Sequence, residues 1–393
     1  MAMRRVFSVK PVSTTGELEV QVVDDLGHPV PGAYVSVYPL GAGLEADADG
    51  RAAFDALPPG PSAASALKAG YGPDPEGDEG PVRQDVEITA GEQAQLTLTV
   101  QRMPRIITEN ILLVGSELHY RSFPLKMMFV APAFAVVSQG QILRTPDKTT
   151  ILLVDAGYSS DEKDVLQALE TSSATTLVPI TDVAQVAAHF NAGRAVVDDG
   201  VERTKTRVQD VAIFCHGFPH KLALNLSPSL AAGMDFTATQ LKDIHADVFV
   251  PHGRIFSYAC RTGASKDAKE FANDAEAGPE NSLAQKLADH FGVDVFAFLT
   301  RTWYGEVLTT GKAELATLSD TLARKRAAAA GDIVDLSLLH EALPHPGLGG
   351  GKSWLTGTGN YALWRKPGAV AMPCGHDTPA GLTREMRHFV PYR

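Results

Sequence analysis

Two stretches of the chain place a reactive side chain at the end of an apolar run. VQDVAIFCHG (208–217) ends in His216 and Gly217, and RIFSYACRTG (254–263) leads into Cys260. A thiol is a strong nucleophile as its thiolate, and an adjacent imidazole can activate it. The 44 residues between the histidine and the cysteine leave room for one helix and its loops. If both runs are neighbouring strands of a parallel sheet, their ends lie side by side and form a cysteine-histidine pair.

The chain from residue 148 onward has the periodicity that such a sheet requires. Continuous apolar runs such as TTILLVDAG (149–157) and VDVFAFLT (293–300) alternate with helical patterns. Strands that are buried on both faces and alternate with helices are typical of a mostly parallel sheet flanked by helices. We therefore expect an α/β domain over 148–393, which includes a C-terminal extension. Ligands of such sheets bind beyond the carboxyl ends of the strands.

Residues 16–103 have a different pattern, in which short alternating runs are separated by turn residues. In ELEVQVVDD (17–25), apolar and polar side chains alternate, which indicates a half-buried strand. Short strands at this spacing predict a small antiparallel all-β sandwich. We expect residues 1–15 to be an N-terminal extension and residues 104–147 to be a connecting segment between the two domains.

Composition limits the partners and the compartment. The chain is 44% hydrophobic and 21% charged, as in soluble globular proteins, and its net charge of -11 argues against nucleic-acid binding. No run approaches the roughly 18 apolar residues of a membrane span. Three scattered cysteines, Cys215, Cys260 and Cys374, indicate a reducing compartment. The first residues carry no apolar run of a secretory signal, so we expect a cytoplasmic protein, with signal-independent secretion left open.

The predicted sandwich resembles the carboxypeptidase-regulatory, or transthyretin-like, family. The resemblance rests on turn and core residues: Val23-Asp24, Gly27, Pro29-Val30, Gly32-Ala33-Tyr34-Val35, Asp49-Gly50, Phe54, Leu57-Pro58, Gly60 and Ala69-Gly70-Tyr71. It covers nearly all of this domain. The resemblance implies an accessory domain without chemistry of its own, which we expect to dock a protein partner or substrate.

The paired motif of the second domain resembles the caspase-like cysteine peptidases, among them the metacaspases and the bacterial CHAT group. The positions closest to the CHAT pattern are Ser257, Ala259-Cys260, Thr262-Gly263 and Ser282-Leu283-Ala284. The resemblance covers about 148–305 and implies a caspase-like fold and a cysteine endopeptidase. In this reading Cys260 attacks the peptide carbonyl, and His216 activates the thiol or protonates the leaving amine.

The same resemblance assigns the oxyanion hole to the backbone N–H groups of Gly217 and Cys260. Glycine at position 217 has its own physical reason, because the missing Cβ lets a substrate backbone come close. The family does not require an acidic third residue that orients His216. The sequence does not point to one.

The substrate pocket is assigned to Asp155 and Tyr258. Relatives that cut after Arg or Lys commonly carry an acidic side chain two residues before the cysteine, where this chain has Tyr258, and another at the end of the first strand, where Asp155 stands. A carboxylate there would select a basic side chain. Asp155 could equally cap the following turn or helix. The sequence favours cleavage of protein substrates after Arg or Lys.

The polar segment 265–281 after the cysteine has two interpretations. It is a solvated loop, or it is an activation loop with self-cleavage at Lys266 or Lys269. Its carboxylates, which could alternatively hold calcium, are Asp267, Asp274, Glu276 and Glu280. They lack the fixed spacing of an EF-hand loop. No zinc-ligand spacing accompanies the cysteine-histidine pair, so we expect no metal and no cofactor.

Two other functions remain open at this point. One is a catalytically silent scaffold that uses a caspase-like fold for binding, although the intact cysteine-histidine pair argues against it. The other is a cysteine hydrolase that acts on a small amide. A substrate panel separates this hydrolase from a peptidase, because a peptidase prefers extended peptides.

Overall fold

The computed structural model describes the residues 14–74, 80–118, 126–139, 143–173, 175–200, 202–226, 234–301, 323, 378–383 and 386–392. The chain divides into two compact units, Met1–Arg105 with Val196–Lys205, and Ile106–Ala195 with Thr206–Arg393. Cys374, most of the predicted N-terminal extension and most of the predicted C-terminal extension lie outside the described residues.

The first unit contains the predicted β-sandwich. One sheet has the strand order β4-β1-β8-β6 and the other β3-β2-β5-β7. The strands are β1 (Gly16–Asp24), β2 (Tyr34–Tyr38), β3 (Ala42–Glu45), β4 (Arg51–Leu57), β5 (Gly60–Leu67), β6 (Tyr71–Gly72), β7 (Val82–Ile88) and β8 (Gln93–Arg102). Leu18, Val20 and Val22 alternate into the core and are almost fully buried, as their spacing predicted.

One pair of strands in the sandwich departs from the predicted antiparallel arrangement. Strands β1 and β8 pair in parallel, with Glu17 opposite Gln93 and Asp24 opposite Val100. Hairpin turns make consecutive strands antiparallel, but β1 and β8 are the first and last strands of the sandwich and no hairpin joins them. The short strand β13 (Val197–Asp198), which pairs with the start of β14, also belongs to the first unit.

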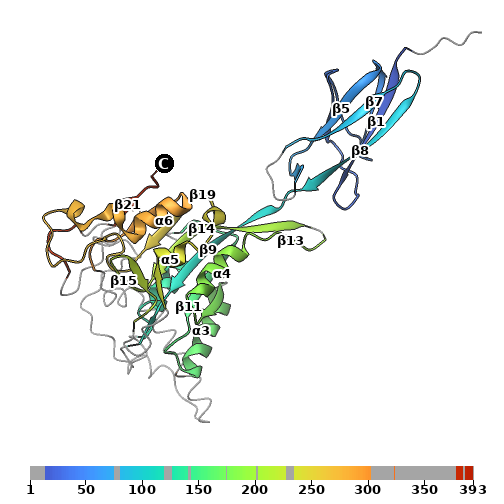
Figure 1. The fold of residues 1–393 in the computed structure, drawn as a ribbon. Coiled ribbons are helices and arrows are strands. Elements are labelled where there is room, and N and C mark those ends of the chain that lie inside the picture. The colour runs from blue at the N-terminus through green and yellow to red at the C-terminus, as the bar shows by residue number, and fades with distance from the viewer. Residues whose placement is uncertain are drawn as a thin grey trace, which may run out of the picture. The chain divides into compact units, whose positions relative to one another are not determined.

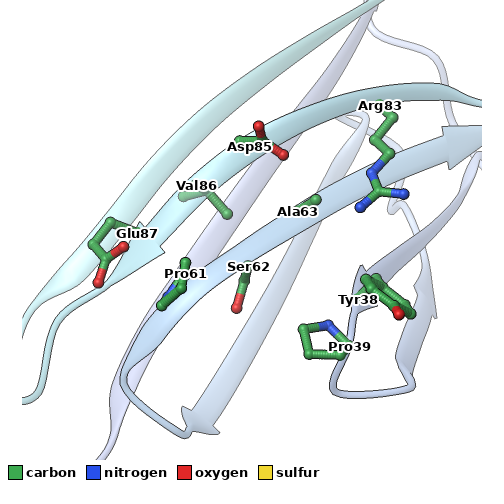
Figure 2. Close-up of a pocket in the computed structure, with 9 residues that line it drawn as sticks. All are labelled: Tyr38, Pro39, Pro61, Ser62, Ala63, Arg83, Asp85, Val86 and Glu87. Atoms are coloured by element: carbon green, nitrogen blue, oxygen red, sulfur yellow. The ribbon is translucent and has the colours of Figure 1, made fainter.

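The first unit has an open groove of about 630 Å³ (Figure 2). Its lining residues are Tyr38, Pro39, Pro61, Ser62, Ala63, Arg83, Asp85, Val86 and Glu87. The guanidinium of Arg83 lies 5.2 Å from the centre of the Tyr38 ring, and the side chain of Tyr38 is largely exposed. The groove therefore combines an aromatic surface with charges of both signs.

The second unit is built on the strand order β12-β11-β9-β14-β19-β20-β21. Figure 1 labels five of these strands, β9, β11, β14, β19 and β21. The strands are β9 (Arg105–Val114), β11 (Lys148–Val154), β12 (Thr176–Ile180), β14 (Arg203–Phe214), β19 (Phe249–Ser257), β20 (Asp294–Ala297) and β21 (Arg387–Phe389). The pairs β11/β12, β9/β11, β14/β19 and β19/β20 are parallel, whereas β21 runs antiparallel to β20. The predicted mostly parallel sheet is therefore present.

The predicted connecting segment 104–147 is wrong, because it supplies a strand in the middle of this sheet. Strand β9 lies between β11 and β14, and its last four residues, Ile111 to Val114, are all buried. The same segment contains the helix α2 (Val130–Gln139). A continuous apolar run buried on both faces is typical of a central parallel strand. The second unit therefore begins near residue 106 and not at residue 148.

Helices pack against both faces of the sheet. Leu112 and Val114 of β9 belong to one apolar cluster, together with residues of α2 and of α3 (Ser160–Ser173). The alternate residues Ile111 and Leu113 belong to a second cluster, with α4 (Ala184–Ala192), α5 (Ala238–Leu241) and α6 (Leu283–Phe291). Because alternate side chains of a strand point to opposite faces, these two clusters cover the two faces.

Short elements complete the second unit. The three-stranded sheet β15-β16-β18 consists of β15 (His216–Phe218), β16 (Lys221–Ala223) and β18 (Asp235–Thr237), and β10 (Ser116–Glu117) pairs with β17 (Asn225–Leu226). The 3-10 helices are η1 (Ala246–Val248), η2 (Asp274–Ala277) and η3 (Pro279–Asn281). Within the described residues, no helix is both long and apolar enough to cross a membrane.

A buried ionic cluster joins two strands of the sheet to the segment before β11. The fully buried carboxylate of Asp210, in β14, lies 2.6 Å from Arg254 in β19 and 2.6 Å from Arg144. Burial alone would raise the pKa of Asp210, but the hydrogen bonds from the two guanidinium groups outweigh it and hold this pKa below its usual value. The aspartate is therefore charged at neutral pH.

Candidate active site

Three adjacent strands of the sheet end at the candidate site. Strand β9 leads through β10 to Glu117, β14 leads to His216, and β19 leads to Cys260. Along the chain, β11 and β12 follow on one side of β9, whereas β14, β19 and β20 lie on its other side. The direction of strand addition therefore reverses between β9 and β14. Ligands of open α/β sheets bind beyond the strand ends at such a reversal.

His216 is held by two side chains of the second unit. Its Nε2 lies 2.7 Å from Oε2 of Glu117, and its ring and the ring of Phe129 form a T-shaped contact with 5.0 Å between ring centres and an interplanar angle of 86°. The side chain of Glu117 is 1% exposed and that of His216 is 25% exposed. One side of the imidazole therefore faces a buried carboxylate, and part of the ring is accessible.

Gly217 brings the histidine strand against the cysteine strand. A Cβ atom at this position would lie 2.8 Å from the backbone nitrogen of Cys260 and 2.9 Å from Cβ of Ala259, and it would also overlap the carbonyl oxygen of Cys260. The close approach that requires glycine is therefore to the backbone of Cys260 itself. This contact makes His216 and Cys260 near neighbours.

A methyl group at position 217 should therefore disturb the site. We expect Gly217→Ala to lower kcat/KM for peptide hydrolysis about 100-fold, because displacement of reacting groups by about 1 Å costs that much. Steady-state kinetics, with urea unfolding to confirm that the variant is folded, measures this. A folded variant with the wild-type kcat/KM would contradict the argument.

The turn that carries Cys260 is fixed by its surroundings. Arg261 has a φ of 57°, a left-handed conformation that is uncommon for a residue with a side chain and is often found at functional sites. Its N–H donates to the carbonyl of Thr300 at 3.0 Å. The N–H of Ala284, in the first turn of α6, donates to the carbonyl of Thr262 at 3.1 Å. The segment that follows β20 and the start of α6 therefore position the cysteine.

The two cysteines near this edge have different environments. Cys260 is partly exposed, whereas Cys215 is fully buried in the apolar cluster that contains α4, α5 and α6. Burial raises the pKa of the Cys215 thiol well above its ordinary range. Phe129, which contacts His216, belongs to the cluster on the other face. Cys215 is therefore a packed thiol.

The two residues assigned to the substrate pocket have different surroundings. Tyr258 is fully buried and stacks on Phe214, with 4.8 Å between ring centres, so it is a core residue and does not line an open pocket. Asp155 pairs with Lys163 of α3 at 2.7 Å. Its strand, β11, is separated from β14 by β9. Of the predicted site residues, Gly217 and Cys260 lie close together, whereas Tyr258 does not line the pocket.

The segment 265–281 after the cysteine is folded against the C-terminal part of the chain. Lys266 and Lys269, the predicted self-cleavage sites, are both exposed. The carbonyl of Lys269 accepts a hydrogen bond from the N–H of Ala380 at 3.0 Å, and the N–H of Phe271 donates to the carbonyl of Ala380 at 3.1 Å. The backbone at Lys269 is therefore engaged in pairing, and cleavage there requires local opening.

The carboxylates of this segment have separate protein partners. Asp267 pairs with Arg261 at 2.8 Å, and Asp274 accepts hydrogen bonds from the backbone and side chain of Thr383. Glu276 accepts one from the N–H of Ala272. In the part of the chain that the structure describes, no group of three or more histidine, cysteine, aspartate or glutamate side chains could hold a metal ion.

The residue that the sequence analysis missed is Glu117. It follows the apolar run ILLVG (111–115), which has the same form as the run before Asp155 but was assigned to a connecting segment. Recognising that run as a strand would have placed an acidic side chain at the same sheet edge as His216. The missed signal was therefore the strand and not the glutamate alone.

Comparisons with known proteins add no family. No family model matches the chain, and no curated protein matches it. Among solved structures, the Bacillus anthracis TIE protein is 20% identical over 26% of this chain and 19% of its own length, with a TM-score of 0.22. The minor pilin GBS52 of Streptococcus agalactiae is 19% identical over 24% and 47%, with a TM-score of 0.20. The match covers less than two thirds of the length of each of these two proteins. TM-scores this low support no conclusion about fold or function.

Proposed function

We propose that this protein is a cysteine endopeptidase with Cys260 as nucleophile and His216 as the acid-base group. The observation that supports it most is the close approach of Gly217, the residue after His216, to the backbone of Cys260, whose side chain is partly exposed. We also propose that the second unit has a caspase-like fold. The paired His-Gly and Ala-Cys motifs support this, together with the mostly parallel sheet.

The proposed reaction follows from these two groups. His216 takes the proton of the Cys260 thiol, and Sγ forms a bond with the carbonyl carbon of the substrate. The oxyanion that forms is stabilised by backbone N–H donors, for which the family resemblance suggests Gly217 and Cys260. The carbon–nitrogen bond then breaks, and His216 returns the proton to the leaving amine. Water hydrolyses the thioester, which releases the acid and restores the thiol.

Cleavage after Arg or Lys remains part of the proposal. Of the two residues predicted to line the pocket, Asp155 has the carboxylate, and 28% of its side chain is exposed. Its ion pair with Lys163 shows that this carboxylate can bind an ammonium group. A basic substrate side chain would have to replace Lys163.

The test is turnover of a fluorogenic library of extended peptides by the purified chain, compared with single-residue amides, before and after alkylation with iodoacetamide. We expect extended peptides with Arg or Lys before the cut to be hydrolysed, and alkylation of Cys260 to stop it. Intact-mass measurement during the assay detects self-cleavage at Lys266 or Lys269. Turnover of single-residue amides alone would favour the small-amide hydrolase. No turnover would favour the non-catalytic scaffold.

The proposal includes three further predictions. The first unit is proposed to bind a protein partner or substrate, and its groove at Tyr38 is the candidate surface. A cytoplasmic location and activity without calcium are also predictions. Adding calcium or a chelator to the peptide assay tests the second of these.

A further inference from the structure

A buried carboxylate lies on the side of His216 that contacts β10. Oε2 of Glu117 is 2.7 Å from Nε2 of His216, and the Glu117 side chain is 1% exposed. At this distance and burial, the contact is a strong hydrogen bond to a charged acceptor, whether the imidazole that donates is neutral or protonated. Water competes little for it. The carboxylate accepts, and the imidazole Nε2–H donates. The contact therefore fixes which ring nitrogen carries a proton in the neutral histidine.

The backbone around Glu117 is held in register with the histidine strand. The N–H of Gly115 donates to the carbonyl of Phe214 at 2.8 Å, and the N–H of Ser116 donates to the carbonyl of Leu224 at 2.8 Å. A Cβ at position 115 would lie 2.6 Å from that Leu224 oxygen and 2.7 Å from Cβ of Cys215, so glycine allows this close approach. The carboxylate is therefore placed by the same strands that place the imidazole.

We propose that Glu117 is a positioning residue that completes a Cys260-His216-Glu117 triad, one member from the end of each of three adjacent strands. This inference rests on the proposed function. By accepting from Nε2–H, Glu117 leaves Nδ1 of His216 to exchange the proton with the Cys260 thiol. The edge contact with Phe129 limits rotation of the ring. A buried acidic group that orients a histidine and stabilises its imidazolium form is the third member of hydrolase triads.

The sheet contains a second buried glutamate-histidine pair that serves as a matched control. Glu109, on the same strand β9, lies 3.1 Å from Nε2 of His189, and the Glu109 side chain is 4% exposed. Glu109 lies in the middle of β9, whereas Glu117 follows the end of this strand. If Glu117 only stabilises the fold, Glu117→Gln should resemble Glu109→Gln, which removes a carboxylate that also contacts Thr150 and Lys148, and should leave the chemistry unchanged. If Glu117 positions His216, only Glu117→Gln should affect the chemistry.

The experiment compares wild type, Glu117→Gln, Glu117→Asp and Glu109→Gln in the full chain. For peptide hydrolysis we expect Glu117→Gln to lower kcat by roughly 100-fold or more with KM changed less than about threefold, because the amide can favour the wrong tautomer. Glu117→Asp keeps the charge on a shorter side chain, so its kcat should lie between that of wild type and that of Glu117→Gln. Glu109→Gln should keep kcat within about twofold, whatever its unfolding midpoint in urea.

A second readout does not depend on a peptide substrate. The rate at which iodoacetamide alkylates Cys260, followed by mass spectrometry of the peptide that contains it, reports activation of the thiol. We expect Glu117→Gln to lower this rate at least about tenfold and Glu109→Gln to leave it unchanged, because thiolate formation depends on the positioned imidazole. If the wild type cleaves no peptide but shows this pattern, the proposed peptidase function fails and the positioning role of Glu117 stands.

Three outcomes would overturn the inference. One is a Glu117→Gln variant with wild-type kcat and a wild-type alkylation rate. Another is an equal loss of kcat and of unfolding midpoint in Glu117→Gln and Glu109→Gln, which would make Glu117 a structural residue. The third is a Cys260 thiol that reacts no faster than free cysteine in the wild type, because there would then be no activated pair for Glu117 to position.

Discussion

Cys260→Ala is expected to lower kcat for peptide hydrolysis roughly a million-fold, to the background rate. In the proposed reaction the thiolate of this residue forms the covalent intermediate, and alanine has no atom that can replace it. Loss of the nucleophile in a well-studied hydrolase costs about this factor. Initial rates with the best substrate from the peptide library, at enzyme concentrations high enough to detect residual turnover, provide the measurement.

Cys215→Ala is the matched control for this prediction. Cys215 lies next to His216 in sequence, but its side chain is fully buried in the apolar cluster on the opposite face of the sheet. Removing its sulfur should leave kcat within about threefold of wild type and cost about 1 kcal/mol of stability. Equal activity of Cys260→Ala and wild type would exclude Cys260 as the nucleophile. A loss of activity confined to Cys215→Ala would mean that Cys215, and not Cys260, is the reactive thiol.

Asp210→Ala is expected to destabilise the chain by about 3–5 kcal/mol, the largest effect on stability that we predict. The carboxylate is fully buried between Arg144 and Arg254. Its removal leaves two guanidinium groups without their shared partner, and breaking a buried pair from one side costs this much. Urea unfolding followed by circular dichroism measures the change.

The control and the pH dependence make this prediction specific. Asp235, which pairs with Lys221 at 2.6 Å but is 36% exposed, should lose less than about 1 kcal/mol on replacement by alanine. The pKa of Asp210 is lowered in the folded chain, so its contribution is present above its unfolded pKa of about 3.9 and is lost as the pH falls through the lower folded value. The difference between wild type and Asp210→Ala should therefore shrink as the pH falls below about 3.9. A constant difference would contradict the argument.

Much of the architecture followed from periodicity. Alternation in β1 identified a strand with one buried face, and Leu18, Val20 and Val22 are indeed in the core. Continuous apolar runs identified β11, β14, β19 and β20 as strands of a mostly parallel sheet. These signals are local, because burial on one or both faces is written into each strand separately.

The features that were missed depend on contacts between distant segments. Glu117 and His216 are 99 residues apart, and their hydrogen bond follows only from the position of β9 next to β14. Sequence spacing gives no strand order. Tyr258 was assigned to a pocket because of its position two residues before Cys260, but alternation along the strand turns its ring into the core against Phe214. The position before the cysteine predicted a pocket residue, but the direction of the side chain makes Tyr258 a core residue.

The order of the strands in the sheet determines when the site can form during protein synthesis. Residues 117, 216 and 260 are contributed by three strands that crossover connections separate, so the site exists only after β9, β14 and β19 have paired. At roughly 5–20 residues per second, the ribosome needs about 7–30 s to advance from the first of these residues to the last. Contacts of such long range also form late in folding. On the proposed function, a nascent chain therefore cannot cut its neighbours before synthesis and folding of this unit are complete.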